Sequence, residues 1–165
     1  MNMVALADAP GDRDFFTSEE YSATSSLLQR PLSGRRYFPS GAVLEERSTV
    51  TVDTLDRFCQ ERGIPHIDLL KLDVQGGELL VLRGARDLLQ GHAVDVIYTE
   101  AAFVPHYEGG VLFAELVQFL QAYEYSLFNL FDLHVARNGQ LRYCDAIFIS
   151  PETRARVVDA APPED

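Results

Sequence analysis

The sequence predicts an α/β fold with a mostly parallel sheet and an antiparallel hairpin at its C-terminal end. Apolar runs of strand length alternate with amphipathic segments of helical period between residues 48 and 121. Two of these runs, residues 67–74 and 94–100, are nearly continuous, as in parallel strands covered on both faces. Asn138-Gly139 then separates two further apolar runs, which is the strongest short-range hairpin signal. At 165 residues the chain fits one domain with a real core.

The first third of the chain carries weaker signals. Residues 1–8 are expected to form a short strand that ends at the turn around Pro10-Gly11, and Phe15-Phe16 a second short strand. Residues 17–48 are rich in serine, proline and glycine and are expected to form one long loop. Loops of this length inside a compact domain are uncommon and are usually functional or disordered.

Regular elements are expected from residue 48 onward. Residues 48–52 are β-branched and strand-like, Asp53 is the expected cap of the next helix, and Gly63 is its expected end. The strand at 67–74, a helix ending near Gly91, the strand at 94–100, a loop at 101–110 and a helix around 113–120 follow. The hairpin comprises residues 125–136 and 141–149. We therefore expect one domain over residues 1–155 and a flexible acidic tail over 156–165.

Composition excludes several classes of function. A net charge of −11 disfavours binding to nucleic acid or to an anionic membrane surface. The sequence shows no apolar run near the roughly 20 residues of a membrane span, and no basic leader. Two isolated cysteines, Cys59 and Cys144, indicate reduced buried thiols, and no residue spacing suggests a metal site. A soluble cytoplasmic protein is expected.

The carboxyl ends of the predicted strands carry acidic residues. Asp73 ends one apolar run, Gln75 and Glu78 follow it with two glycines between, and Glu100 ends the next run. Ligands of open α/β sheets bind at these strand ends. A structural alternative exists for Asp73 and Glu78, because carboxylates also stabilise the first turn of a helix.

Three stretches in order resemble the C-terminal two-thirds of FkbM-type methyltransferases. They are Val52-Asp53-Thr54-Leu55-Asp56, the run from Ile67-Asp68-Leu69-Leu70 through Lys71-Leu72-Asp73-Val74-Gln75-Gly76-Gly77-Glu78, and Val81-Leu82-Arg83-Gly84-Ala85. Weaker matches are Ala5-Leu6-Ala7-Asp8, Ser25-Ser26-Leu27 and Glu100.

This resemblance implies a Rossmann-like class I fold in which S-adenosylmethionine donates a methyl group to a hydroxyl of a sugar or natural product. The chain departs from the family because it contains no Gly-x-Gly-x-x-Gly, and the first two strands of the fold are expected to be missing. The strand at 67–74 would then be an exposed hydrophobic edge. We expect a fragment that lacks full activity alone; the alternative is a non-catalytic remnant or partner subunit that pairs with the same or another chain through this edge.

The resemblance also suggests roles for individual residues. The expected cofactor-binding residues are Asp8, Asp73, Gln75 and Glu78. The expected bases are Asp73, Glu100 and His106. The expected contacts to a small-molecule acceptor are Ser25, Ser26 and Tyr107. Simpler interpretations stay open: Asp8 as a turn residue, His106 as an exposed loop histidine, and Ser25 and Ser26 as parts of a flexible loop. Lys71 interrupts an apolar strand and is expected to pair with Glu100.

Overall fold

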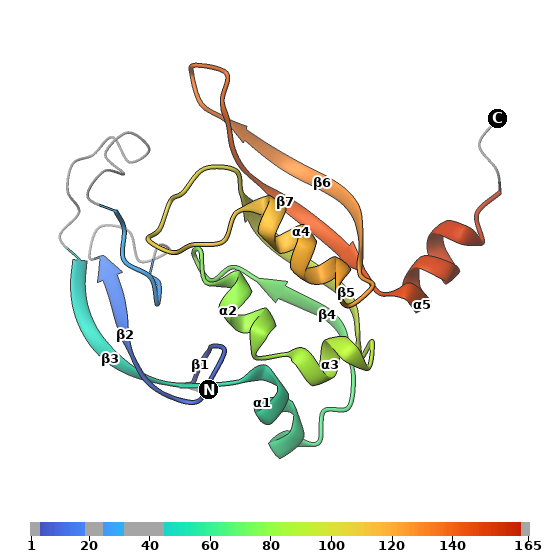
Figure 1. Ribbon diagram of the computed structural model, residues 1–165, viewed down its shortest axis with the longest axis horizontal. Coiled ribbons are helices and arrows are strands. Elements are labelled where there is room, and N and C mark those ends of the chain that lie inside the picture. The colour runs from blue at the N-terminus through green and yellow to red at the C-terminus, as the bar shows by residue number, and fades with distance from the viewer. Residues whose placement is uncertain (1–3, 19–24, 32–44, 163–165) are drawn as a thin grey trace.

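The computed structural model describes residues 4–18, 25–31 and 45–162, which form two sheets and several helices (Figure 1). The three-stranded sheet has the order β1-β3-β2 and the four-stranded sheet the order β4-β5-β7-β6. The strands are β1 (Ala5–Leu6), β2 (Gly11–Ser18), β3 (Glu45–Asp53), β4 (Ile67–Leu72), β5 (Val94–Ala102), β6 (Ser126–Val135) and β7 (Leu141–Ile149). The helices are α1 (Leu55–Arg62), α2 (Glu78–Arg83), α3 (Arg86–Gln90), α4 (Phe113–Gln121), α5 (Pro151–Arg154) and the π-helical η3 (Ala155–Asp159).

The sheets are less parallel than the sequence suggested. Among the described strands, β1 with β3 and β4 with β5 are the parallel pairs. The pairs β2 with β3, β5 with β7 and β6 with β7 are antiparallel. The expectation of a mostly parallel sheet is therefore wrong for the described residues, whereas the mixed α/β class and the C-terminal hairpin are confirmed.

The expected long loop is shorter than predicted at both ends. Strand β2 extends to Ser18, well beyond Phe15-Phe16, and β3 begins at Glu45 rather than at residue 48. The two strands pair from Gly11 with Val52 to Ser18 with Glu45. Ser26, inside the expected loop, also forms an isolated bridge with Phe16.

Helix α1 begins one residue later than expected. Its N-cap is Thr54, whose hydroxyl oxygen accepts a hydrogen bond from the Arg57 amide at 3.2 Å. Asp53 instead accepts from the Thr54 amide through its side chain. Gly63 ends the helix in the left-handed region with φ 62, as predicted, where a residue without Cβ has no steric penalty.

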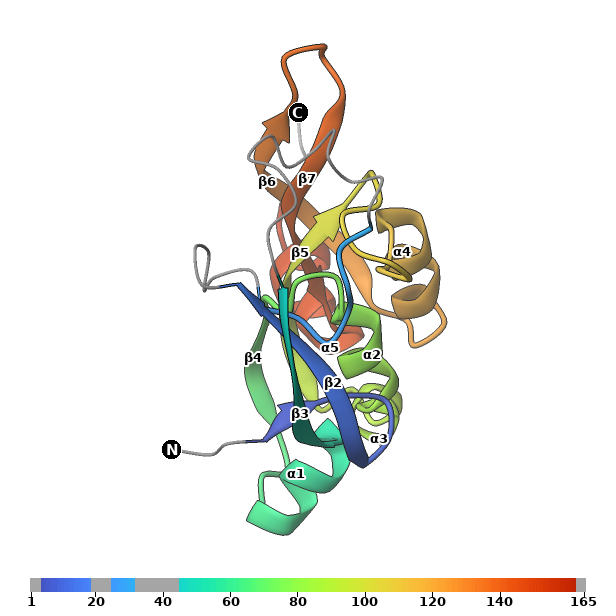
Figure 2. The ribbon, with the colours of Figure 1, turned by 90° about the vertical axis from the view of Figure 1, so that its left-hand side faces the viewer.

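Helices α2, α3 and α4 cover one face of the four-stranded sheet at β4 and β5. In Figure 2, α2, α3 and α4 lie on the same side of β4 and β5. Leu70 and Leu72 face these helices and belong to the hydrophobic core. Leu69, on the other face, is 60% exposed, so the prediction that this strand is covered on both faces is wrong. Lys71 is exposed as well and pairs with Asp73 at 3.5 Å, not with Glu100.

A glycine joins the two sheets. A Cβ atom on Gly84 would lie 2.1 Å from the Ala7 carbonyl oxygen and 3.3 Å from the Thr54 Cα. The Gly84 carbonyl accepts from the Asp56 amide at 2.9 Å, and the Asp56 carboxylate accepts from the amides of Asp87 and Leu88. The Leu-Arg-Gly-Ala stretch is thus the place where β1, α1 and α3 meet.

The C-terminal region contains the predicted hairpin and a short helical segment after it. The hairpin turn has Gly139 at φ 85, and the Ala136 amide donates to the Gln140 carbonyl at 2.8 Å. After β7, Ser150 caps α5, and residues 155–159 form a π-helical turn where a tail was expected from 156. Among the described helices, none is long and apolar enough to cross a membrane.

Candidate functional site

A small cavity lies at the carboxyl ends of β4 and β5, where the sequence placed the site. Its volume of about 10 Å³ is roughly that of one water molecule. The lining includes Gly76, Glu78, Glu100, His106, Tyr107 and Gly110. The residues come from the turn after β4, from β5 and from the loop between β5 and α4, so three segments meet here.

Glu78 shapes the turn after β4. One carboxylate oxygen accepts from the Val74 amide at 3.3 Å and from the Gly76 amide at 3.2 Å. Its side chain is only 3% exposed, and burial raises its pKa above the ordinary value despite these amide donors. Glu78 therefore holds the backbone of the turn that follows Asp73.

Gln75 connects this turn to two distant segments. Its side-chain carbonyl accepts from the Tyr107 hydroxyl at 2.8 Å, and its side-chain NH₂ donates to Asp73 at 2.9 Å. Its main-chain carbonyl accepts from the Ser26 hydroxyl at 2.8 Å. Gln75 itself has φ 54, an uncommon conformation for a residue with a side chain.

Tyr107 packs directly on the turn. A Cβ on Gly76 would lie 2.8 Å from the Tyr107 ring, and Gly76 has φ 90, so only glycine fits there. The Val111 amide donates to the Gly76 carbonyl at 3.3 Å. Burial raises the pKa of Tyr107 to about 12, so its hydroxyl stays protonated as the donor to Gln75.

Glu100 is a partly buried carboxylate with a raised pKa. Partial burial, followed by the negative charges of Glu78, Asp73 and Asp145, raises its pKa to about 7. Asp145 lies opposite it on β7, and the Tyr98 hydroxyl donates to Asp145. Near neutral pH, Glu100 is thus divided between the charged and the neutral form.

His106 is buried rather than exposed. It is 8% accessible, and its Nε2 lies 3.1 Å from the Arg142 guanidinium. Burial and the neighbouring positive charge lower its pKa to about 4. The expectation of an exposed loop histidine is wrong, and the imidazole is neutral at physiological pH.

The remaining predicted residues, Asp8, Ser25 and Ser26, do not line the cavity. Asp8 lies in the turn between β1 and β2 of the three-stranded sheet, where it pairs with Arg13. Ser26 is buried and contacts the turn, as described; Ser25 precedes it and is partly exposed.

Arg142 and Asp145 were not predicted from the sequence. Both lie on β7, and both act on site residues through the antiparallel pairing of β5 with β7. The pairing places Glu100 opposite Asp145 and Ala102 opposite Tyr143. The hairpin signal revealed that β7 exists, but no sequence signal defined its register against β5.

A group of possible metal ligands lies elsewhere, although the sequence spacing suggested none. His66, Asp68 and Asp95 place ligand atoms within 4.8 Å of one another near the amino ends of β4 and β5. Asp95 already pairs with His66 at 3.5 Å and with Arg156 at 3.4 Å. The group lies at the opposite end of the strands from the cavity.

Comparison with known proteins identifies the family. Residues 2–127 match the family model of the methyltransferase FkbM domain. The chain is 30% identical over 128 residues to the 2-O-methyltransferase NoeI of Sinorhizobium fredii (strain NBRC 101917 / NGR234). That alignment covers 73% of this chain and 51% of the relative, so the chain spans about half the length of the curated relative it matches. No solved structure matches the chain significantly. The chain belongs to the FkbM methyltransferase family.

Proposed function

We propose that this chain contributes to S-adenosylmethionine-dependent O-methylation of a hydroxyl group on a sugar or natural product. Membership of the FkbM family and the likeness to a protein named as a 2-O-methyltransferase support this proposal. The carboxylates at the ends of β4 and β5 lie where ligands of α/β sheets bind.

The observation that carries the proposal is the place of Glu100 in the cavity lining beside Glu78, where burial and, after it, neighbouring carboxylates raise its pKa to about 7. Removing a proton from a hydroxyl at neutral pH calls for a base whose pKa lies near the working pH. His106, with a pKa near 4 and Arg142 against its Nε2, is a poorer base. Asp73 is exposed, accepts a hydrogen bond from Gln75 and forms an ion pair with Lys71. Glu100 is therefore the proposed general base, and Asp73 is proposed to contact the cofactor.

The negative charges of Asp73, Glu78 and Glu100 are complementary to the positive charge of the cofactor. S-adenosylmethionine supplies an electrophilic methyl group on a positively charged sulfonium. Burial and, after it, repulsion by Glu78 and Asp73 raise the pKa of Glu100, and a nearby cation relieves the repulsive part. Asp73 and Glu78 are proposed to face the positive part of the cofactor, whereas Gln75 uses both ends of its amide within the protein. With no glycine-rich cofactor turn in the sequence, the chain alone is expected to bind the cofactor weakly.

The test is methyl transfer at high donor concentration. The chain is incubated with millimolar S-adenosylmethionine carrying a labelled methyl group and with a panel of neutral glycosides. Labelled product is expected, and Glu100→Gln is expected to lower its rate by roughly 10²-fold or more. Glu108→Gln, an exposed carboxylate in the same loop as His106, is the matched control. Full activity of Glu100→Gln would remove this residue from the mechanism.

Calorimetry with S-adenosylmethionine tests whether the chain alone binds the cofactor weakly. Micromolar binding by the chain alone would contradict the view that the described carboxylates form only part of the cofactor site.

One observation favours the alternative of a non-catalytic partner subunit. The outer edge of β4 pairs with no strand among the described residues. Absence of labelled product from the wild-type chain at millimolar donor would favour this alternative over catalysis.

A further inference from the structure

The hydroxyl group of Tyr107 makes two hydrogen bonds whose directions are fixed by the partners. The Arg30 guanidinium hydrogen-bonds Tyr107, and because a guanidinium can only donate, the phenol oxygen accepts there. The single hydroxyl proton is therefore left for Gln75, whose side-chain carbonyl accepts it at 2.8 Å. Tyr107 thus receives one hydrogen bond and gives the other.

These directions determine which way the Gln75 amide faces. A glutamine side chain offers an acceptor oxygen and a donor NH₂ group, and a hydroxyl can bond to either. Since the Tyr107 proton takes the oxygen, the NH₂ group is turned toward Asp73, to which it donates at 2.9 Å. A carboxylate only accepts, so the requirements at both ends of the amide agree. The series of hydrogen bonds runs in one direction, from Arg30 to Asp73.

The Asp73 carboxylate is restrained although it is exposed. Its side chain is 53% accessible, yet one oxygen accepts from Gln75 and the other lies 3.5 Å from the Lys71 ammonium. An exposed ion pair of this kind contributes little by itself, because solvent screens it and the lysine side chain loses entropy. The orientation of Asp73 therefore depends mainly on the hydrogen bond from Gln75.

The segment that carries Arg30 is docked on the same turn and loop. The Ser26 hydroxyl donates to the main-chain carbonyl of Gln75 at 2.8 Å. The Glu108 amide, next to Tyr107, donates to the Gln29 carbonyl at 2.8 Å. These bonds lie on either side of the contact between Arg30 and Tyr107, so they hold the guanidinium beside the phenol.

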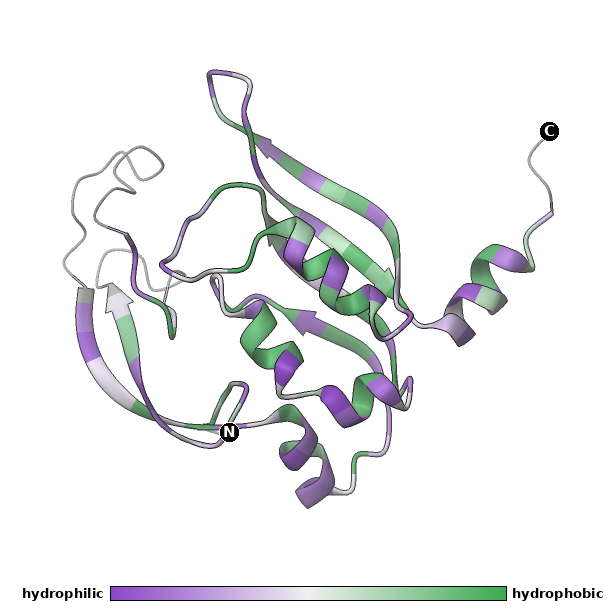
Figure 3. Cartoon of the chain, viewed as in Figure 1, coloured by the Kyte–Doolittle hydropathy of each residue, from purple (hydrophilic) through white to green (hydrophobic). Residues whose placement is uncertain are grey.

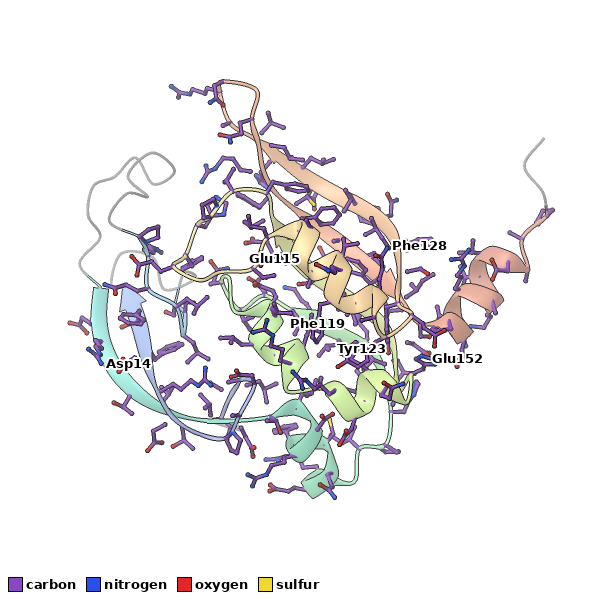
Figure 4. All side chains as sticks on the ribbon, in the orientation of Figure 1. Asp14, Glu115, Phe119, Tyr123, Phe128 and Glu152 are labelled. Carbon is purple, nitrogen blue, oxygen red and sulfur yellow. The ribbon has the colours of Figure 1, made fainter. Side chains whose placement is uncertain are left out.

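The loop that carries Tyr107 is held at both ends. Figure 3 shows hydrophobic residues at its two ends and hydrophilic ones between them. The rings of Phe103 and Phe113, one before and one after the loop, lie 5.0 Å apart between centroids. Glu115, labelled on α4 in Figure 4, accepts from the Leu112 amide at 3.0 Å and fixes the start of that helix. Tyr107 is thus presented to Gln75 from a restrained backbone.

We propose that Tyr107 is a positioning residue, which orients the Gln75 amide and thereby holds the Asp73 carboxylate for the cofactor. The inference rests on the proposed contact of Asp73 with S-adenosylmethionine. It gives Tyr107 a role on the cofactor side rather than in holding the acceptor, because its one hydroxyl proton is donated within the protein.

Nuclear magnetic resonance of the Gln75 side-chain NH₂ group tests the orientation without any cofactor. In the wild-type chain these protons are expected to exchange slowly with water, because the group donates to Asp73. Tyr107→Phe removes the proton that fixes the amide oxygen, and the exchange is expected to become about fivefold faster. Unchanged exchange in this variant would overturn the proposal.

Tyr125→Phe is the matched control. The Tyr125 hydroxyl also donates at 2.8 Å, but to the Val94 carbonyl at the amino end of β5, away from the cavity. This variant loses a hydrogen bond of the same length, so general destabilisation affects both variants. The Gln75 signals are expected to stay unchanged in Tyr125→Phe, and an equal acceleration there would also count against the proposal.

The affinity for S-adenosylmethionine tests the consequence for the cofactor. It is measured from chemical-shift changes on titration to about 5 mM cofactor, a range suited to weak binding. Tyr107→Phe is expected to weaken binding about fivefold, and Tyr125→Phe to leave it unchanged. In the Asp73→Asn background, Tyr107→Phe is expected to cause no further loss, because residues that act through one contact are not additive.

The outcomes separate this inference from the proposed function. If Asp73→Asn weakens binding and Tyr107→Phe does not, or if the two losses add, the positioning role is overturned while the cofactor contact stands. If the wild-type chain shows no binding at this concentration, or Asp73→Asn binds as the wild type does, the proposed cofactor contact fails and the inference fails with it.

Discussion

Replacing Glu100 with glutamine is expected to stabilise the protein at alkaline pH. Burial and three neighbouring carboxylates raise the pKa of Glu100 from 4.5 to about 7 in the folded chain. Between these pH values the folded protein keeps the proton that the unfolded chain releases, so folding stability falls as the pH rises through this window. Glutamine resembles the protonated form and is not subject to this loss.

The magnitude follows from the size of the pKa change. A rise from 4.5 to about 7 corresponds to about 3 kcal/mol of differential free energy for a fully buried group. Glu100 is only partly buried, and solvent screening reduces this to roughly 1–2 kcal/mol. The variant is therefore expected to exceed the wild type by about 1–2 kcal/mol at pH 8, and by a few tenths of a kcal/mol at pH 5.

Urea unfolding followed by circular dichroism at both pH values measures this difference. Buried His106, whose pKa is lowered to about 4, gives wild type and variant alike a loss of stability as pH falls below about 6.5. That contribution cancels when the two proteins are compared at each pH. Glu108→Gln, an exposed site, is expected to show no such gain. A gain that is absent, or equal at pH 5 and pH 8, would refute the reasoning.

Three further results are expected. Gly84→Ala should destabilise the chain by about 3 kcal/mol or more in urea unfolding, because its Cβ would overlap the Ala7 carbonyl and backbone cannot yield easily. Tyr107→Phe should cost about 1 kcal/mol of stability through loss of the hydrogen bond to Gln75; an unchanged midpoint would contradict that contact. Cys144, fully buried and with its pKa raised to about 11, should react with a thiol reagent only after unfolding, and rapid labelling of the native protein would count against the fold.

The sequence predicted correctly that four polar residues lie at the carboxyl ends of neighbouring strands. Asp73, Gln75, Glu78 and Glu100 were expected at the carboxyl ends of two neighbouring strands, and β4 and β5 bring them there in parallel register. The apolar runs and the acids that follow them are local features, which a single sequence displays directly. Their chemical roles are the subject of the proposals above.

The predictions that were wrong or missing depend on contacts between residues that lie far apart in the sequence. Lys71 was expected to be buried because its strand is apolar, but only one face of β4 is covered by helices. Burial is the largest cause of the pKa shifts of Glu100 and His106. Asp145 adds to the first and Arg142 to the second, through a register that no local pattern defines. The pairing of β2 with β3 likewise joins segments on both sides of a long connection.

The hydrogen bonds of Gln75 have a consequence for the order of folding. Ser26 and Tyr107 lie 49 and 32 residues away from Gln75 in the sequence, one on each side. Closing such separations costs chain entropy before the contacts repay it. We therefore expect the contacts of the turn that follows Asp73 with Ser26 and Tyr107 to form late in folding, whereas its hydrogen bonds to Glu78 are local. Loosening either segment in the folded protein releases the same turn, so amide exchange at residues 74–77 should report on both.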